Sequence, residues 1–290
     1  MKFVVFAFLG TSIPALVACG NTEAGGGDTE AIGQATQAFQ RITRRDAGPP
    51  LTFSLFSFTS TVSKSGKYAD GDVRLDSVTR GDETWSQDNL QKVEWAKILV
   101  DNGVDSTNGG HNLASGRGIS SDLDGWEDDG PATVTPTSED LAESLGNFDL
   151  TSIVVTRENV GTASVELRFR EPSTTFFFWE RGDTTSPTGA NSDTLVEALD
   201  GRGRTIASHK LLRTEYSATG ISVTTWNGAF KLPSTPDGAL PVLGSVGLSL
   251  EIPVSRLRLT STQQAAGGTQ DNGPDYKVVA SDPEHSPGRR

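Results

Sequence analysis

The sequence is poor in cysteine and in basic residues, and it has no long apolar run. A single cysteine among 290 residues excludes an intramolecular disulfide and a thiolate metal cluster. Lysine and arginine number 25 against 37 aspartates and glutamates, so the net charge is −12. A chain this acidic repels the phosphate backbone, and we expect no nucleic-acid partner. Because no apolar run matches the thickness of a bilayer, a polytopic membrane protein is excluded as well.

Glycine and proline, by contrast, are abundant, with 32 and 14 residues. Such a share favours a turn-rich β protein over a helical one. Hydrophobic residues make up 34% of the chain and charged residues 21%, which is too apolar for wholesale disorder. The composition therefore predicts a folded domain with many turns.

The N-terminus carries the pattern of an export signal. Lys2 supplies a positive charge, residues 3–9 form an unbroken apolar run, and residues 16–18 (LVA) precede Cys19. The apolar run is too short to span a bilayer, which is typical of a secretory signal peptide over residues 1–18. The four residues ending at Cys19 resemble the lipobox of bacterial lipoproteins. That resemblance implies that Cys19 becomes the mature N-terminus and carries acyl chains, palmitate among them.

Gly20 and Asn21 follow the cysteine, and the aspartate associated with inner-membrane retention is absent. The resemblance therefore implies sorting to the outer membrane or cell surface, with the membrane as partner through the acyl chains. The alternative is an ordinary signal peptide cut after Ala18, which leaves Cys19 as an unmodified thiol. An unpaired thiol in an exported protein is open to oxidation, and this favours the lipidated form.

After the signal, the chain divides by composition. Residues 19–50 begin as a Gly-rich acidic tether, and residues 31–45 have apolar side chains at the spacing of a short helix. Residues 51–280 form the predicted folded domain. The polar residues 281–290 are expected to be a disordered tail.

Within the folded domain, apolar and polar residues alternate with a period of two. Residues 163–170 (ASVELRFR), for example, place three apolar side chains on one face and charged side chains on the other. The pattern predicts an all-β fold, an antiparallel β-sandwich or jelly roll, with one helix at 138–145 that begins at Thr137 or Ser138 and ends at Gly146. The expected strands are 52–62, 72–79, 92–100, 151–157, 163–170, 174–180, 193–199, 204–212, 221–226, 242–250, 254–260 and 275–280.

Two stretches, 177–182 (FFWERG) and 272–277 (NGPDYK), are distinctive as a pair. Shorter ones accompany them: LDSV at 75–78, SLGN at 144–147, NSD at 191–193 and VEALD at 196–200. From about residue 73 to 280 these stretches resemble bacterial exosortase-dependent (PEP-CTERM type) surface proteins. The resemblance implies an exported, surface-held β protein, and it brings no catalytic residues.

The C-terminus departs from that family. Its usual sorting signal has a Pro-Glu-Pro-like motif, an apolar span and a basic end. Here Pro283-Glu284 and Arg289-Arg290 are present with no apolar span between them. We therefore expect a lipid on Cys19 to replace the family's usual anchor.

No catalytic constellation emerges from the sequence, and we expect no enzyme. His111, His209 and His285 show no metal-ligand spacing and have no cysteine partner, which argues against a zinc or Cys-His site. Glu171 and Glu180 flank an aromatic strand, but a straight strand separates them by about 30 Å and points them to opposite faces. Glycosidase carboxylates lie far closer together. We expect Trp179 in the core and Glu180 paired with Arg181 at the strand end.

Residues 122–129 (DLDGWEDD) hold five carboxylates in a loop context. Such a loop suits calcium, which takes several oxygen ligands in flexible geometry, although a solvated acidic loop is the plainer interpretation. Asp271 and Asp275 form a second, weaker candidate. No other cofactor is expected.

Five tryptophans raise the question of sugar binding, because β-sandwich modules stack sugar rings on exposed aromatic side chains. Trp95 and Trp179 lie in apolar strand contexts and are predicted to be in the core. Trp85, Trp126 and Trp226 lie in or beside predicted loops, where exposure is expected.

Arg-Gly-Asp, a motif associated with adhesion, occurs twice, at 80–82 and 181–183. It is weak evidence, because three-residue matches arise by chance.

The sequence as a whole predicts a lipid-anchored, exported bacterial envelope protein with a structural or binding role. The alternative is a carbohydrate-binding or polysaccharide-acting surface protein, with envelope polysaccharide as its partner.

Overall fold

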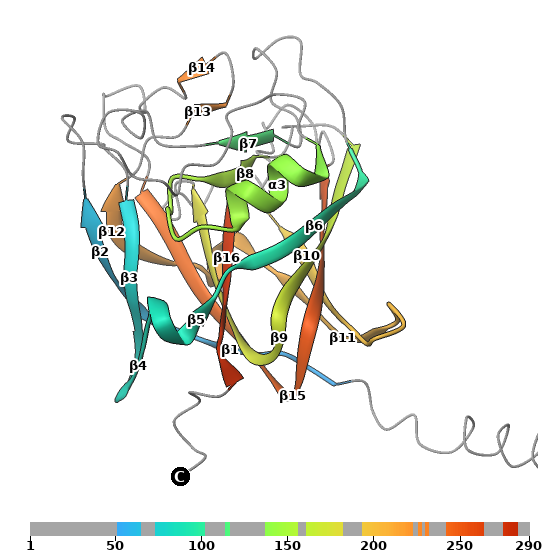
Figure 1. Ribbon diagram of the computed structural model, residues 1–290, viewed down its shortest axis with the longest axis horizontal. Coiled ribbons are helices and arrows are strands. Elements are labelled where there is room, and N and C mark those ends of the chain that lie inside the picture. Colours follow the sequence, from blue (N-terminus) through green and yellow to red (C-terminus); the bar gives the residue numbers. More distant parts are fainter. Residues whose placement is uncertain are drawn as a thin grey trace, which may run out of the picture. The chain divides into compact units, whose positions relative to one another are not determined.

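The protein is described by a computed structural model over residues 51–64, 73–101, 114–116, 137–155, 161–181, 193–222, 226–227, 230–231, 242–263 and 275–283. These residues form an 11-stranded sheet, a three-stranded sheet and a two-stranded sheet, and the paired strands run antiparallel (Figure 1). The predicted all-β fold is therefore confirmed. None of the described helices is long and apolar enough to cross a membrane. Cys19 and the segments predicted at 1–50 lie outside the described residues.

The described elements include strands that the sequence pattern does not predict, among them Glu83–Ser86 and Ala114–Gly116. The strands are β1 (Ser54–Phe56), β2 (Thr59–Lys64), β3 (Val73–Arg80), β4 (Glu83–Ser86), β5 (Leu90–Gln91), β6 (Val93–Val100), β7 (Ala114–Gly116), β8 (Ile153–Val155), β9 (Gly161–Arg181), β10 (Thr194–Leu199), β11 (Thr205–Leu211), β12 (Ser217–Ser222), β13 (Trp226–Asn227), β14 (Phe230–Lys231), β15 (Val242–Gln263) and β16 (Asp275–Ser281). The helical elements are η1 (Gln87–Asn89), α3 (Ser138–Leu145) and η2 (Arg213–Glu215).

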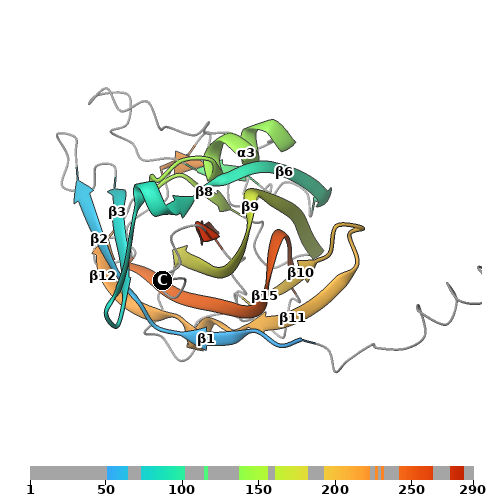
Figure 2. The same cartoon turned by 60° about the horizontal axis from the view of Figure 1, so that its bottom comes forward.

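Two long strands, β9 and β15, form the centre of the large sheet and pair with each other from Leu243↔Arg181 to Gln263↔Gly161. The first part of β9 also pairs with β6, and its last part pairs with β16. Likewise, β15 pairs with β1 and β12 near its start and with β10 near its end. Every other strand of the large sheet is positioned directly or indirectly by this central pair (Figure 2).

Both long strands bend sharply, which the separate predictions at 163–170 and 174–180, and at 242–250 and 254–260, did not include. Phe169 and Phe176 would lie about 23 Å apart in a straight strand. Their ring centroids are instead 5.5 Å apart. Pro172 and Pro253 lie at the two bends, where the β9–β15 register shifts. Because proline lacks a ladder donor, it suits such an interruption.

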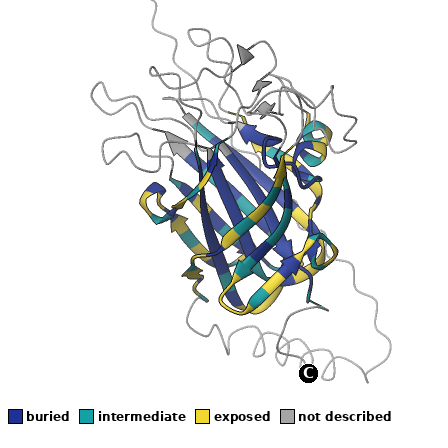
Figure 3. Ribbon diagram, turned by 90° about the vertical axis from the view of Figure 1, so that its left-hand side faces the viewer, coloured by how far each residue is buried: buried dark blue, intermediate teal, exposed yellow. Residues whose placement is uncertain are grey.

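The bend creates two hydrophobic cores. Apolar residues from both parts of β9, among them Val165, Leu167 and Phe178, fill the core between the folded-over layers. Phe177 and Trp179 point to the opposite face and form a second core with the three-stranded sheet β2–β3–β4. Figure 3 shows that the central strands are buried along most of their described length.

The helix α3 begins and ends where the sequence predicts. Thr137 is the N-cap, and it forms a capping box with Asp140, while Gly146 is the C-cap. The helix also covers the free edge of β6, because Ser138 Oγ accepts a hydrogen bond from the Ile98 N–H at 3.1 Å. An edge covered in this way is closed to further strand pairing.

Candidate functional site

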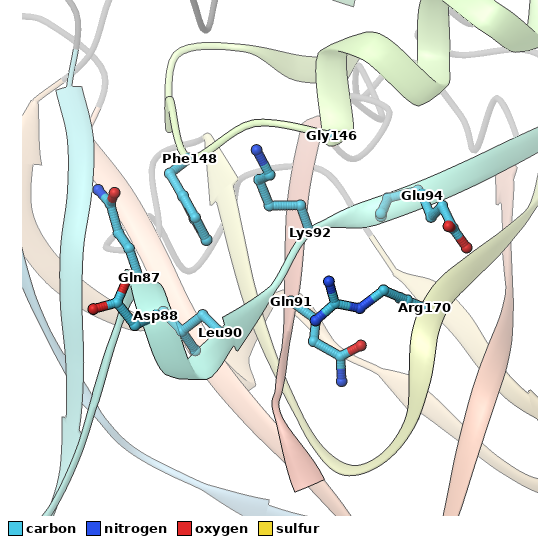
Figure 4. A pocket seen from close by; sticks show the side chains of 10 residues that line it. Gln87, Asp88, Leu90, Gln91, Lys92, Glu94, Gly146, Phe148 and Arg170 are labelled. Carbon is cyan, nitrogen blue, oxygen red and sulfur yellow. The ribbon is translucent and has the colours of Figure 1, made fainter. Parts of the chain in front are cut away.

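An open cleft of about 500 Å³ lies where β5 and the start of β6 meet the loop after α3 (Figure 4). Its apolar lining comes from Leu90, Val93 and Phe148, which are at most 7% exposed. The other lining residues are polar, charged or glycine: Gln87, Asp88, Gln91, Lys92, Glu94, Gly146 and Arg170. The cleft is thus a polar opening above a small apolar floor, as in many ligand sites.

Two glutamines fix the frame of the cleft. Gln91 bridges β9 and β16, because its side chain accepts from the Glu171 N–H at 2.8 Å and donates to the Ser281 carbonyl at 3.0 Å. Gln87 donates to the Leu75 carbonyl at 2.5 Å. These amides bind backbone groups, so their role at the cleft is to hold its walls in place.

Lys92 and Arg170 supply the positive charge of the cleft. The Lys92 ammonium lies 5.4 Å from the centroid of the Phe148 ring, within range of a cation–π contact. Arg170 lies 4.0 Å from Asp282, and 69% of its side chain is exposed. A pair at that distance and exposure contributes little, so the guanidinium can still donate to a ligand.

The loop that forms one wall of the cleft, residues 146–152, is held from inside by Lys277 on β16. Lys277 is 0% exposed. Its Nζ donates to the Ser144 carbonyl at 2.6 Å, to Asn147 Oδ1 at 2.5 Å and to the Ser152 carbonyl at 3.0 Å. Three acceptors match the three donors of an ammonium, and they tie the end of α3 to the last strand.

Asp149 lies in the same loop and is 1% exposed. Its Oδ1 accepts hydrogen bonds from the Thr151 N–H at 2.8 Å and the Thr151 hydroxyl at 2.6 Å, whereas Oδ2 has no hydrogen-bond partner among the described residues. Burial raises the pKa of the Asp149 carboxyl, although the hydrogen bonds from Thr151 and the charge of Lys277 oppose the rise. The loop therefore contributes a buried carboxamide, Asn147, and a buried carboxyl group, Asp149, to the surroundings of the Lys277 amine on β16.

Trp95 corrects the sequence prediction, because it is 41% exposed and not in the core. Val93 pairs with Phe169 and Trp95 pairs with Arg168, so β6 advances two residues while β9 advances one. This β-bulge turns both Glu94 and Trp95 outward. The shift explains why an apolar strand context placed Trp95 wrongly.

The outward face beside Trp95 carries a row of ion pairs across four strands. Glu166 accepts from Arg256 at 2.5 Å, Glu197 pairs with Arg258 at 3.3 Å, and Glu94 pairs with Arg168 at 3.5 Å. Opposite charges on neighbouring strands stabilise the sheet modestly. The row makes this face polar, with Trp95 as an exposed aromatic at its β6 edge.

For the other tryptophans, the predicted exposure is confirmed at Trp179 and wrong at Trp85. Trp179 is fully buried as predicted, and its indole N–H donates to Ser60 Oγ at 3.0 Å. Trp85 was expected near the surface, but it is 3% exposed, because its strand β4 packs onto Phe177 with ring centroids 5.3 Å apart. Trp126 lies outside the described residues, and Trp226 lies in β13.

Most of the predicted ligand residues fall outside the described part of the chain. They are His111, His285, residues 122–129 and Asp271. Asp275 lies in β16. His209 lies in β11, with Nε2 3.1 Å from Glu215 Oε2. Within the described ranges, no group of three or more His, Cys, Asp or Glu side chains could hold a metal ion.

Glu171 and Glu180 lie in different environments, the first exposed and the second 1% exposed. Of the two Arg-Gly-Asp motifs, the first forms the β3–β4 turn, where the Arg80 guanidinium lies 4.1 Å from the centroid of the Phe56 ring. The second begins at Arg181, the last residue of β9.

Sequence reasoning missed the cleft residues Lys92, Phe148 and Arg170 and the buried Lys277. They come from four separate segments that only the fold brings together, and no linear spacing could have revealed them.

Comparison of the chain with protein-family models, with curated proteins and with solved structures finds no significant match. The resemblance to exosortase-dependent surface proteins therefore stays a prediction.

Proposed function

We propose that this chain is an exported bacterial envelope protein, held at the outer membrane or cell surface by acyl chains on Cys19, with a binding role. The observation that carries the location is the order of Lys2, the apolar run 3–9 and the lipobox ending at Cys19. The Gly-rich residues 20–30 would then tether a β-sandwich that begins near residue 51. The cleft beside β6 supports the binding role.

The location is tested by mass spectrometry of the mature N-terminus and by fractionation of a Cys19→Ser variant. We expect an acylated Cys19 in the wild-type chain, and release of the variant into the soluble fraction. A mature chain without acyl groups, together with a variant that fractionates like the wild type, would refute the anchoring.

We also propose that the cleft binds polysaccharide. Sugar hydroxyls both donate and accept hydrogen bonds, so they match a site whose lining includes both cations and carboxylates, here Lys92, Arg170, Asp88 and Glu94. The exposed Trp95 next to Glu94 offers a ring on which a sugar can stack.

The ligand is tested by calorimetry with soluble envelope polysaccharide. We expect the double variant Lys92→Gln/Arg170→Gln, and separately Trp95→Ala, to weaken binding at least tenfold. The control Arg202→Gln/Lys210→Gln removes the same charge from β10–β11 turn and β11 positions outside the cleft lining. Equal losses in both double variants would indicate a general charge effect and would contradict a site at the cleft.

A further inference from the structure

The buried group formed by Lys277, Asn147 and Asp149 has the components of an amide-forming reaction. Lys277 Nζ lies 2.5 Å from Asn147 Oδ1, shorter than the usual 2.9 Å or so for such a pair. Because a carbonyl bond is about 1.23 Å long, Nζ lies within about 3.7 Å of the Asn147 Cγ. That separation is close to the distance from which reacting atoms combine.

Both ends of the Asn147 carboxamide are held by hydrogen bonds. The Asp149 N–H donates to Asn147 Oδ1 at 3.1 Å, and it would continue to do so if negative charge developed on that oxygen. The Asn147 Nδ2 group donates to the Glu143 carbonyl at 3.3 Å. The carbonyl oxygen therefore has a fixed donor, and the nitrogen that would leave is held on the other side.

We propose that Lys277 and Asn147 react with each other after folding, and that an isopeptide bond joins the β16 side chain to the loop after α3. Asp149 is the group that moves protons in this reaction. Its carboxyl lies in the same turn as Asn147, and it interacts electrostatically with Lys277. The reaction needs no cofactor, oxidant or partner chain.

The steps balance as follows. Asp149 removes a proton from the Lys277 ammonium, and the free amine attacks Cγ of Asn147, which gives a tetrahedral species with its negative charge on Oδ1. Asp149 then gives a proton to Nδ2 and takes one from Nζ. The Cγ–Nδ2 bond breaks as the carbonyl re-forms. The departing ammonia takes the last proton from Asp149 and leaves as ammonium, which returns Asp149 to its carboxylate form. Lysine ammonium and asparagine carboxamide thus become a secondary amide and ammonium ion.

Burial favours the reaction in two ways. It raises the pKa of the Asp149 carboxyl, so the acid that gives a proton to Nδ2 forms more easily. It also excludes water, which would otherwise compete as a nucleophile. The raised pKa of Asp149 is consistent with both roles.

Peptide mapping of the purified full-length protein by tandem mass spectrometry tests the bond. We expect a branched peptide that contains residues 147 and 277, lighter than its two linear parts by one ammonia, with no tryptic cleavage after Lys277. In Asp149→Asn, which keeps an acceptor for Thr151, the branched peptide should fall at least tenfold. Lys210→Met, an exposed position on β11, should leave it unchanged.

Loss of ammonia alone does not establish the bond. Asn272-Gly273, which lies on the same tryptic peptide as Lys277, also loses ammonia when it forms a succinimide. The fragment ions that link residues 147 and 277 distinguish the two products. Linear peptides for Asn147 and Lys277 in the folded wild-type chain, with no branched product, would overturn the proposal even if every variant failed to fold.

Discussion

Phe177 and Phe178 are neighbours in the chain and lie in different hydrophobic cores. The Phe177 ring lies edge-on to Phe58, with centroids 5.1 Å apart, in the core shared with the three-stranded sheet. Phe178 lies in the core between the folded layers of the large sheet. A strand covered on both faces requires apolar residues in succession, which accounts for the run Phe176–Trp179.

Both Phe177→Ala and Phe178→Ala should destabilise the fold, by about 3–5 kcal/mol each, because each removes a fully buried ring. Hydrogen exchange should separate them. Phe177→Ala is expected to lower protection chiefly in β2, β3 and β4, whereas Phe178→Ala should lower it in β9 and β15. Identical exchange patterns in the two variants would argue for a single continuous core.

The β6 bulge can be tested by comparing the loss of stability when Trp95, which it turns outward, and the buried Trp85 are each replaced by alanine. Trp85→Ala should cost about 3–5 kcal/mol of unfolding free energy, because the side chain is 3% exposed. Trp95→Ala should cost about 1 kcal/mol at most, because its ring faces solvent. Urea denaturation measures both. A larger loss for Trp95 than for Trp85 would mean that β6 pairs with β9 in another register.

Gly247 lies where β15 passes beneath the ring of Phe56, and a Cβ added there would collide with that ring. Gly247→Ala should therefore lower the unfolding free energy by about 1–3 kcal/mol through overpacking. Adding Phe56→Leu should recover part of that loss. Gly201→Ala, at a position with open space around it, is the control and should have little effect. Strict additivity of the Gly247 and Phe56 changes would contradict the contact.

Asp200 makes the turn between β10 and β11 sensitive to acid. The backbone N–H of Arg204 donates to its carboxylate at 2.9 Å, and the Arg202 N–H and the Arg204 side chain do so as well. These contacts hold the pKa of Asp200 below its ordinary value of 3.8. The stability that they supply is present above pH 3.8 and is lost as the pH falls through the lowered pKa.

Asp200→Asn should therefore lower the Tm at neutral pH, and the difference from the wild type should vanish in strong acid. Thermal melts across the acidic range measure this difference. Asp82→Asn, at the exposed turn between β3 and β4, is the matched control. A difference that stays constant with pH would show that the charge of Asp200 contributes nothing.

The sequence predicted the parts of the fold that depend on local pattern. The alternation at Val165, Leu167 and Phe169 indicated a half-buried strand, and Thr137 with Gly146 delimited the helix, because these signals lie within a few residues of one another. The sequence predicts separate strands on either side of Pro172 and of Pro253, where the structure has continuous strands that bend. A proline looks the same in sequence whether a strand ends or turns.

The cleft could not be predicted in the same way. Its charged residues, such as Lys92 and Arg170, resemble ordinary outward positions of a strand, and their convergence depends on the pairing of β6 with β9. The buried Lys277 is a stronger case, because a lysine in a strand near the end of the chain predicts exposure. The three acceptors around its Nζ, which come from the end of α3 and the loop after it, 125 to 133 residues earlier in the chain, offset the cost of its burial.

The central pairing of β9 with β15 also determines when the protein can fold. Strands β1 and β6 are synthesised first, but their described partners in the large sheet lie at residues 247–249 and 164–169. The pairing of β9 with β15 is complete only when residue 263 is available, and β16 comes later still. A chain that leaves the ribosome N-terminus first therefore emerges with β1 and β6 still without their partners in the large sheet, although β2, β3 and β4 can already pair with one another. Assembly is late and dominated by contacts distant in sequence, which favours slow folding.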